Sequence, residues 1–228
     1  MSNKRRCSGG GALLPILSRR VPVAIAALLL AAAAHAGPPF VTDDPEPVEH
    51  GHWEVNYAIS RTWHAGSAST ALPAIDINYG IVPNVQVHAQ PRYSSETDAH
   101  GRKVGLDDTE VGVKSRFMHY ASSDTTFMAG IYPMLQLPTD QRRLGNGRGR
   151  LQSFLPLWVQ IEHGAWSGYG GIAYRINQGP QNRNAVFTGA TLLYKFAPDL
   201  QLGGELFRET AGATDSTSTS GFNLGGNV

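Results

Sequence analysis

The chain has little charge, a single cysteine and hardly any helical periodicity, and each shortage excludes a class of protein. Cys7 lies in the N-terminal segment, so the remaining chain has no disulfide, thiol nucleophile or cysteine-based metal site. Charged residues are 16% of the chain and the formal net charge is +1, so no basic balance points to nucleic acid. What remains is one glycine-rich domain, with 26 glycines, whose segments alternate with period two.

Residues 1–36 predict a secretory signal peptide. An apolar run over 21–34, too short to span a bilayer, follows a basic start and ends in "AHA". A membrane anchor is the weaker alternative. We expect cleavage after Ala36, which removes five basic residues and leaves 14 basic against 18 acidic residues, or a net charge of about −4. The basic residues removed are Lys4, Arg5, Arg6, Arg19 and Arg20. The mature protein is therefore expected in the cell envelope.

Residues 37–51 form a leader that is too rich in proline and acid for regular structure. It is predicted either to lie in the periplasm or to fold into the interior of the domain as a partial plug. Residues 52–228 form the domain itself, and their period-two alternation predicts ten strands. The strands are expected at 52–63, 70–79, 84–93, 107–118, 125–137, 150–162, 166–176, 185–196, 200–210 and 219–228.

The connections between these strands alternate between long and short. Long, polar connections are expected at 64–69, 94–106, 138–149, 177–184 and 211–218. Short ones are expected at 80–83, 119–124, 163–165 and 197–199. Outer-membrane barrels show this asymmetry, with short periplasmic turns and longer outer loops. The sequence therefore predicts an all-β fold, an antiparallel up-and-down transmembrane β-barrel in the cell outer membrane.

The two faces of each strand differ in polarity along their whole length. In "NVQVHAQPRY", Val85 and Val87 alternate with His88 and Arg92, and charges of both signs occupy the polar faces at mid-strand. We expect the apolar face to contact lipid and the polar face to line an enclosed interior. The predicted inward residues are Glu54, Asp76, His88, Arg92, Asp108, Glu110, Lys114, Arg116, Gln152, Gln160, Arg175 and Glu205.

Two arrangements of charge are expected on the polar face: Arg92 opposite Asp108 with Glu110 beside it, and His88 opposite Asp76. Such neighbours are worth only about 0.2–1 kcal/mol each. They would orient the polar parts of a solute, or would simply form a solvated network that keeps the interior wet.

Aromatic residues at the strand ends suggest two girdles. Trp53 and Trp63 share one face and lie about 33 Å apart along the strand, which becomes about 25 Å at a tilt of about 40°. Aromatic rings suit the two water–lipid boundaries, whereas a soluble β core would place them at mid-strand. The predicted girdle residues are Trp53, Trp63, Tyr79, Tyr93, Phe117 and Trp166.

Four prolines conflict with continuous strands. Pro73, Pro91, Pro133 and Pro156 each remove a ladder hydrogen bond, and a closed barrel has no edge to hold them. We expect them at bulges or strand ends.

Two polar clusters carry weaker hypotheses about chemistry. His50 and His52 could bind a metal, but a polar strand start is the favoured interpretation. His64 and Ser67 share a loop, a common coincidence in polar loops that does not indicate an enzyme. No catalytic residue, metal or cofactor is therefore expected.

An arginine cluster lies in the connection "DQRRLGNGRGR". Its members are Arg142, Arg143, Arg148 and Arg150. Arginine pairs well with phosphate oxygens, so the cluster could contact lipopolysaccharide or an anionic solute. A merely solvated loop is the favoured interpretation.

Several strings resemble one family. They are "GPPFVTDDPEPVEHGHWE", "LPAIDINYGIVPNVQVH", "GLDDTEVGVKSRF", "QSFLPLWVQ", "NQGPQNRN" and "GGELFRETA" with "STSGFNLGG". They resemble the MetA-pathway of phenol degradation family of bacterial outer-membrane barrels. The resemblance covers nearly all of the mature chain and implies a protein that helps aromatic compounds cross the outer membrane. It brings no catalytic residue and no cofactor. The chain departs from the family at "GGNV", where two further strands are expected, so a complete barrel would have twelve.

These observations predict a porin-like channel for the passive passage of small molecules, aromatic ones included. Barrels of ten to twelve strands lie between filled and open ones and would leave a narrow path. The residues expected to filter solutes are His88, Arg92, Glu110, Lys114 and Arg116. The alternatives are a structural outer-membrane barrel that transports nothing and a soluble periplasmic β protein.

Overall fold

The structure is a computed structural model that describes residues 40–64, 67–99, 101–139 and 150–227. The chain divides into two units, 1–34 and 35–228, and all described residues belong to the second. The predicted signal peptide and Arg142, Arg143 and Arg148 lie outside the described residues. No helix in the described part of the chain is long and apolar enough to cross a membrane.

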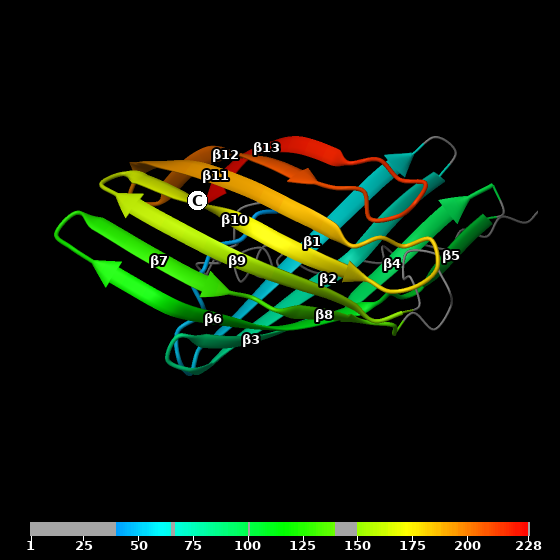
Figure 1. Cartoon of the computed structure of the whole chain (residues 1–228), viewed down its shortest axis with the longest axis horizontal. Coiled ribbons are helices and arrows are strands. Elements are labelled where there is room, and N and C mark those ends of the chain that lie inside the picture. Colours follow the sequence, from blue (N-terminus) through cyan, green and yellow to red (C-terminus); the bar gives the residue numbers. More distant parts are fainter. Residues whose placement is uncertain (1–39, 65–66, 100, 140–149, 228) are drawn as a thin grey trace, which may run out of the picture. The chain divides into compact units, whose positions relative to one another are not determined.

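The described residues form one antiparallel sheet of thirteen strands without helices (Figure 1). The strands are β1 (Trp53–His64), β2 (Ser67–Val82), β3 (Val85–Gln90), β4 (Arg92–Asp98), β5 (Gly101–Leu106), β6 (Thr109–Ala121), β7 (Thr125–Ile131), β8 (Met134–Leu137), β9 (Gln152–His163), β10 (Trp166–Asn177), β11 (Ala185–Ala197), β12 (Leu200–Glu209) and β13 (Thr219–Asn227). The all-β, antiparallel part of the prediction is confirmed.

Short interruptions separate three pairs of consecutive strands. Together β7 and β8 correspond to the strand expected at 125–137, whereas β5 and most of β4 lie in a segment that was expected to be a connection. The interruptions lie between β3 and β4, between β5 and β6, and between β7 and β8. Both β3 and β4 pair with β2, and both β7 and β8 pair with β6 and β9. Counting each pair once gives ten up-and-down strands, the number predicted.

The prolines explain much of this irregularity, as predicted. Pro91 separates β3 from β4, and Pro133 lies between β7 and β8. Pro73 lies where the register of β2 shifts against β4. Pro156 remains inside β9, but the neighbouring strand is interrupted beside it, where the Tyr132 amide donates to the Pro156 carbonyl at 3.3 Å. The missing N–H groups thus coincide with places where the ladder is already broken.

Two predicted long connections are wrong. The segment 64–69 is mostly strand, because β1 continues to His64 and β2 begins at Ser67. The segment 94–106 forms most of β4 and all of β5, paired from Tyr93↔Leu106 to Asp98↔Gly101. Polar side chains misled the sequence interpretation here, since backbone pairing satisfies the ladder whatever the side chains are. The connections 178–184 and 210–218 are long, as expected.

The two outer strands of the sheet remain separate in the observed pairing. Among the described residues, β1 pairs with β2 and β13 pairs with β12, and no ladder joins β1 to β13. Figure 1 shows β1 and β2 running steeply across the direction of β9 to β12, as in a strongly twisted sheet.

Burial on the sheet is the reverse of that in a water-soluble β protein. On β6, Lys114 is 6% exposed, whereas its neighbour Val113 is 43% exposed. The same inversion is found along β9, where Gln152 and Gln160 are buried and Leu155 and Leu157 are exposed. We call the buried side of the sheet the polar face and the other side the apolar face. On β6 and β9 the prediction that apolar and polar residues separate in this sense is confirmed, whereas Val85 and Val87 on β3 are half-buried.

Candidate functional site: the polar face and the docked leader

All twelve residues predicted to point inward are buried or half-buried. Six are buried: His88, Asp108, Lys114, Gln152, Gln160 and Glu205. Six are half-buried: Glu54, Asp76, Arg92, Glu110, Arg116 and Arg175. Eleven of them lie on strands, where the period-two alternation predicts the side that is buried, and Asp108 lies between β5 and β6.

The leader lies against this face, and Glu205 on β12 holds its first described turn. The amide of Val41 donates to Glu205 Oε2 at 2.9 Å, and the amide and hydroxyl of Thr42 both donate to Glu205 Oε1 at 2.6 Å. Asn223 on β13 donates to Oε2 as well, at 2.8 Å. Glu205 is only 2% exposed, so its charge is stabilised by these donors rather than by water.

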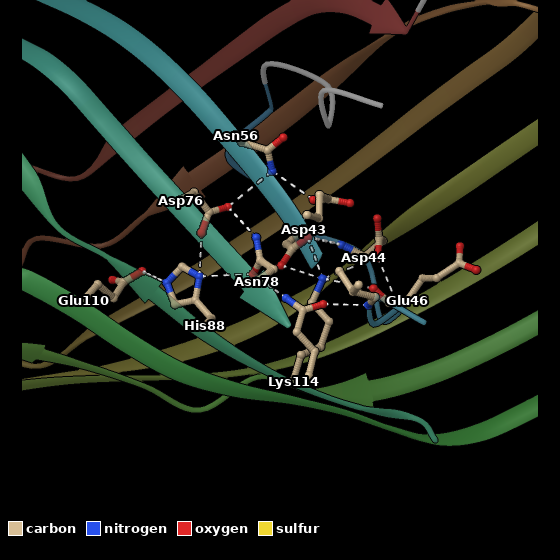
Figure 2. Close-up of polar contacts among 12 residues, drawn as sticks. Asp43, Asp44, Glu46, Asn56, Asp76, Asn78, His88, Glu110 and Lys114 are labelled. Carbon is tan, nitrogen blue, oxygen red and sulfur yellow. Dashed lines mark hydrogen bonds and ion pairs between the residues drawn. The ribbon is translucent and has the colours of Figure 1, made fainter. Parts of the chain in front are cut away.

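Lys114 on β6 holds the next two leader residues. Its Nζ lies 3.1 Å from Asp43 Oδ2 and 3.6 Å from Asp44 Oδ1, and it donates to the Glu46 carbonyl at 3.4 Å (Figure 2). The ammonium also lies 5.0 Å from the centre of the Tyr132 ring. The leader therefore provides the carboxylates that compensate a buried cation.

Further along, the leader passes over β3 and ends beside β2. The Val48 amide donates to the buried Gln86 carboxamide at 2.7 Å. Glu46 lies 3.9 Å from Arg116. His50 forms an isolated bridge with Gly80, where a side chain would collide with the leader backbone at Glu49. The absence of a Cβ at Gly80 is thus required for this close approach.

These contacts require the sheet to curl around the leader. Thr42 and Asp43 are consecutive, yet one contacts β12 and the other contacts β6. Those strands are five spacings apart in the sheet order, which is about 24 Å along the sheet at about 4.8 Å per spacing. Side chains stand nearly perpendicular to a sheet, so both strands reach neighbouring leader residues only if the polar face is concave.

A second charged cluster surrounds His88 on β3. Its Nδ1 lies 2.7 Å from Asp76 Oδ1 and its Nε2 lies 3.5 Å from Glu110 Oε1 (Figure 2). Asn78 donates to the other oxygen of Asp76 at 2.9 Å. His88 therefore contacts Asp76, but the expected position opposite Asp76 is wrong, because Asn78 is the residue directly opposite His88.

The sequence predicted Asp108 opposite Arg92 and Glu110 beside it, and the position of Glu110 is wrong. Glu110 lies opposite Gln90 and pairs with His88 rather than standing beside Arg92. Arg92 donates to the Gln90 carboxamide at 2.9 Å, and its carbonyl accepts from the Asp107 amide at 2.8 Å. The expected strand boundary at 107 was too simple, because Asp107 and Asp108 lie in the interruption between β5 and β6.

An aromatic layer on the polar face was not predicted from the sequence. Phe187 lies 6.1 Å from Trp158 and 6.2 Å from both Phe154 and Phe207, between ring centres. Tyr132 belongs to the same buried cluster. The alternation already contained the signal, since Phe154 and Trp158 share the strand face of Gln152 and Gln160.

Beyond this aromatic layer lies a polar cavity of about 390 Å³. We call it the vestibule. Gln136, Gln152, Asn177 and the Arg175–Glu209 pair line it, and that pair is joined at 2.8 Å. Arg175 also lies over the Phe154 ring, 4.4 Å from its centre. The rest of the lining comes from the long 210–218 connection and the start of β13: Thr210, Gly212, Ser216, Thr217 and Thr219.

The vestibule, the aromatic layer and the leader follow one another along the strands. On β12 the order is Glu209 in the vestibule, Phe207 in the aromatic layer and Glu205 at the leader. On β10, Arg175 lies in the vestibule and Ala173 in the aromatic cluster. The vestibule is thus at the end with the long connections, and the leader enters from the end with the tight turns, where His50 bridges to Gly80.

Four of the predicted girdle residues are exposed on the apolar face. They are Trp53, Tyr93, Phe117 and Trp166. Tyr79 is half-buried because its ring packs on Trp53, with centres 4.4 Å apart. The side chain of Trp63 lies outside the described residues.

The weaker hypotheses gain no support. His50 and His52 are exposed, and His52 lies 3.9 Å from Glu49. Within the described residues, no three His, Cys, Asp or Glu side chains gather as a metal site would require. The side chains of His64 and Ser67 are outside the described set. No family model, curated protein or solved structure matches the chain.

Proposed function

We propose that the protein is an outer-membrane β-barrel channel for small, uncharged or weakly charged molecules, aromatic ones included, and that the docked leader closes it. The observation that carries the proposal is the inverted burial of Lys114 and Val113 on neighbouring positions of β6. Exposing a large apolar side chain to water forgoes about 1.5–3 kcal/mol. A sheet that does so on most of its strands, β6 and β9 to β13 among them, while burying charged side chains is suited to lipid outside and a polar bore inside.

The arrangement of the polar face supports a passage that runs from the long connections to the tight turns. A solute would enter the vestibule, pass the aromatic layer of Phe154, Phe187 and Phe207, and meet the leader at Glu205. Polar side chains around an apolar layer suit molecules that have both kinds of surface. The resemblance to the MetA-pathway of phenol degradation family supports the same class of solute. Lipopolysaccharide is a proposed neighbour of the long connections.

Conductance in planar bilayers tests this function. The refolded protein is expected to show rare or no current steps while the leader is docked. Glu205→Ala, which removes the acceptor for Val41 and Thr42, is expected to produce discrete steps. Uptake of an uncharged aromatic solute into liposomes should rise in the same variant. Glu96→Ala, on β4 outside the leader contacts, is the matched control and should conduct like the unmodified protein.

A structural barrel that transports nothing is the second candidate. The specific observation in its favour is that the leader and the polar-face charges already pair with one another. Absence of both current steps and solute uptake in Glu205→Ala, in protein that stays inserted, would select this candidate. Extraction of the protein into a periplasmic fraction without detergent would reject both.

A further inference from the structure

We infer that Lys114 is the centre of a binding site for small carboxylates, and that the docked leader occupies this site with its own carboxylates. The inference rests on the proposed function in one respect: small carboxylates would reach Lys114 through the bore. It assigns a ligand class to a residue of the polar face and makes the leader a competitor of that ligand.

The first step concerns the burial of Lys114. Its side chain is buried on the polar face, beside the Tyr132 ring, and Gln86 is the residue directly opposite it on β3. A buried ammonium requires anionic or strongly polar partners. The side-chain partners shown for it, Asp43 and Asp44, both belong to the leader.

The second step is that three acidic residues on the strands, all in the described part of the chain, already have other partners. Two acidic residues of the strands around Lys114 are Asp76 and Glu110. Both pair with His88, Asp76 at 2.7 Å and Glu110 at 3.5 Å. Glu205 is bound to the leader amides and to Asn223. When the leader leaves, the site therefore needs an external anion, and the shape it leaves is that of a carboxylate.

The third step is that the leader fits by close approach rather than by charge alone. Pro45 is fully buried, and a Cβ added to Gly130 would contact it. A Cβ added to Gly189 would collide with the Thr42 hydroxyl. Gly189→Ala should therefore displace the leader while every charged group of the site stays in place.

Leader position can be followed by cysteine labelling. In a Cys7→Ser background, Pro45→Cys places one thiol at a position that is buried only while the leader is docked. We expect a maleimide reagent to label this thiol at least threefold faster in sodium acetate than in sodium chloride of equal ionic strength. In Lys114→Met the two salts should give equal rates. Equal rates with Lys114 present, or an acetate effect that survives in Lys114→Met, would overturn the inference.

Binding can also be measured without the leader as reporter. In Gly189→Ala, irradiation of the protein should transfer saturation to the acetate methyl signal in the NMR spectrum. The transfer should fall at least fivefold in Gly189→Ala/Lys114→Met and be retained in Gly189→Ala/Lys114→Arg. Equal transfer in all three variants would show adsorption elsewhere and reject the site.

The outcomes separate this site from the channel function. An acetate effect that depends on Lys114, in a protein that never conducts, would keep the site and reject the channel. Current steps in Glu205→Ala without any acetate effect would keep the channel and reject the site.

Discussion

Leu157 and Trp158 are neighbours on β9 and are both hydrophobic, yet they lie in opposite environments. Leu157 is 43% exposed on the apolar face, and Trp158 is 1% exposed on the polar face, packed on Phe187. On β6, the charged residue Lys114 is buried on the polar face, and its apolar neighbour Val113 is exposed on the apolar face. Hydrophobicity therefore does not decide which side is buried in this protein. What decides it is the medium that each face meets, with the curled sheet and leader on one side and the proposed lipid on the other.

The largest expected effect comes from truncating the inner member of the first pair. Trp158→Ala should lower the free energy of unfolding by about 3–5 kcal/mol, because it leaves a cavity in the aromatic layer. Leu157→Ala should cost far less, since its side chain packs against no protein core. Denaturant unfolding in detergent micelles, followed by circular dichroism, measures both. Equal losses would mean that Leu157 also belongs to a protein core.

A charge on the apolar face should have the next largest effect. Leu157→Arg is expected to destabilise the inserted protein by about 2–4 kcal/mol, because it places a cation at mid-strand in lipid. Tyr120→Arg, near the tight-turn end of β6, is the control and should cost about 0–1 kcal/mol. Unfolding in lipid vesicles gives both values. If Leu157→Arg is harmless, the apolar face does not meet lipid.

The sequence predicts features that depend on neighbouring residues, and it misses contacts between residues far apart in the chain. The side of each inward residue on a strand follows from period two, so Lys114 and Glu205 were placed correctly. The contact between Thr42 and Glu205 spans 163 residues, and no local pattern encodes it. The hairpin of β4 and β5 was missed because serine, threonine and charge were taken as loop signals. Pro91 and Pro133 were correctly expected to break the ladder, because a missing N–H has a local consequence.

A smaller effect is expected on the leader alone. Glu205→Ala should weaken leader docking by about 1.5–3 kcal/mol, since it removes hydrogen bonds to a charged acceptor. The sheet should keep its stability because Glu205 contacts it only through Asn223 among the contacts described. Proteolysis of the leader, compared with unfolding of the whole protein, separates the two quantities. A parallel loss in both would mean that the leader is part of the core.

The smallest predicted effect is a dependence of leader docking on pH. Burial raises the pKa of Asp44 above its ordinary value of 3.8, and burial with the nearby Asp44 and Glu162 carboxylates raises the pKa of Glu46 above 4.5. The docked leader therefore binds protons more readily than the released leader. Docking should strengthen as the pH falls from neutrality through these raised pKa values, and should weaken as the pH rises through them.

Lys114 opposes this shift by lowering both pKa values, Arg116 lowers the pKa of Glu46 alone, and Asp43 raises that of Asp44 further. Labelling of Pro45→Cys, normalised to a free thiol at each pH, should be slower at about pH 5 than at about pH 8. Asp44→Asn/Glu46→Gln should remove the difference. Faster leader release in acid would contradict the assigned direction.

The most direct test of the inverted sheet uses spin labels on the two opposite faces of β9. With Cys7 replaced by serine, the chain has no other cysteine, so Leu157→Cys and Gln160→Cys each carry one label. In lipid vesicles, the label at 157 should collide with oxygen and be shielded from a water-soluble nickel complex. The label at 160 should show low access to oxygen. A label at Lys195→Cys, an exposed position near the end of β11, gives the access expected in water. If the nickel complex reaches the label at 157 as freely as the label at 195, the apolar face lies in water and the account fails.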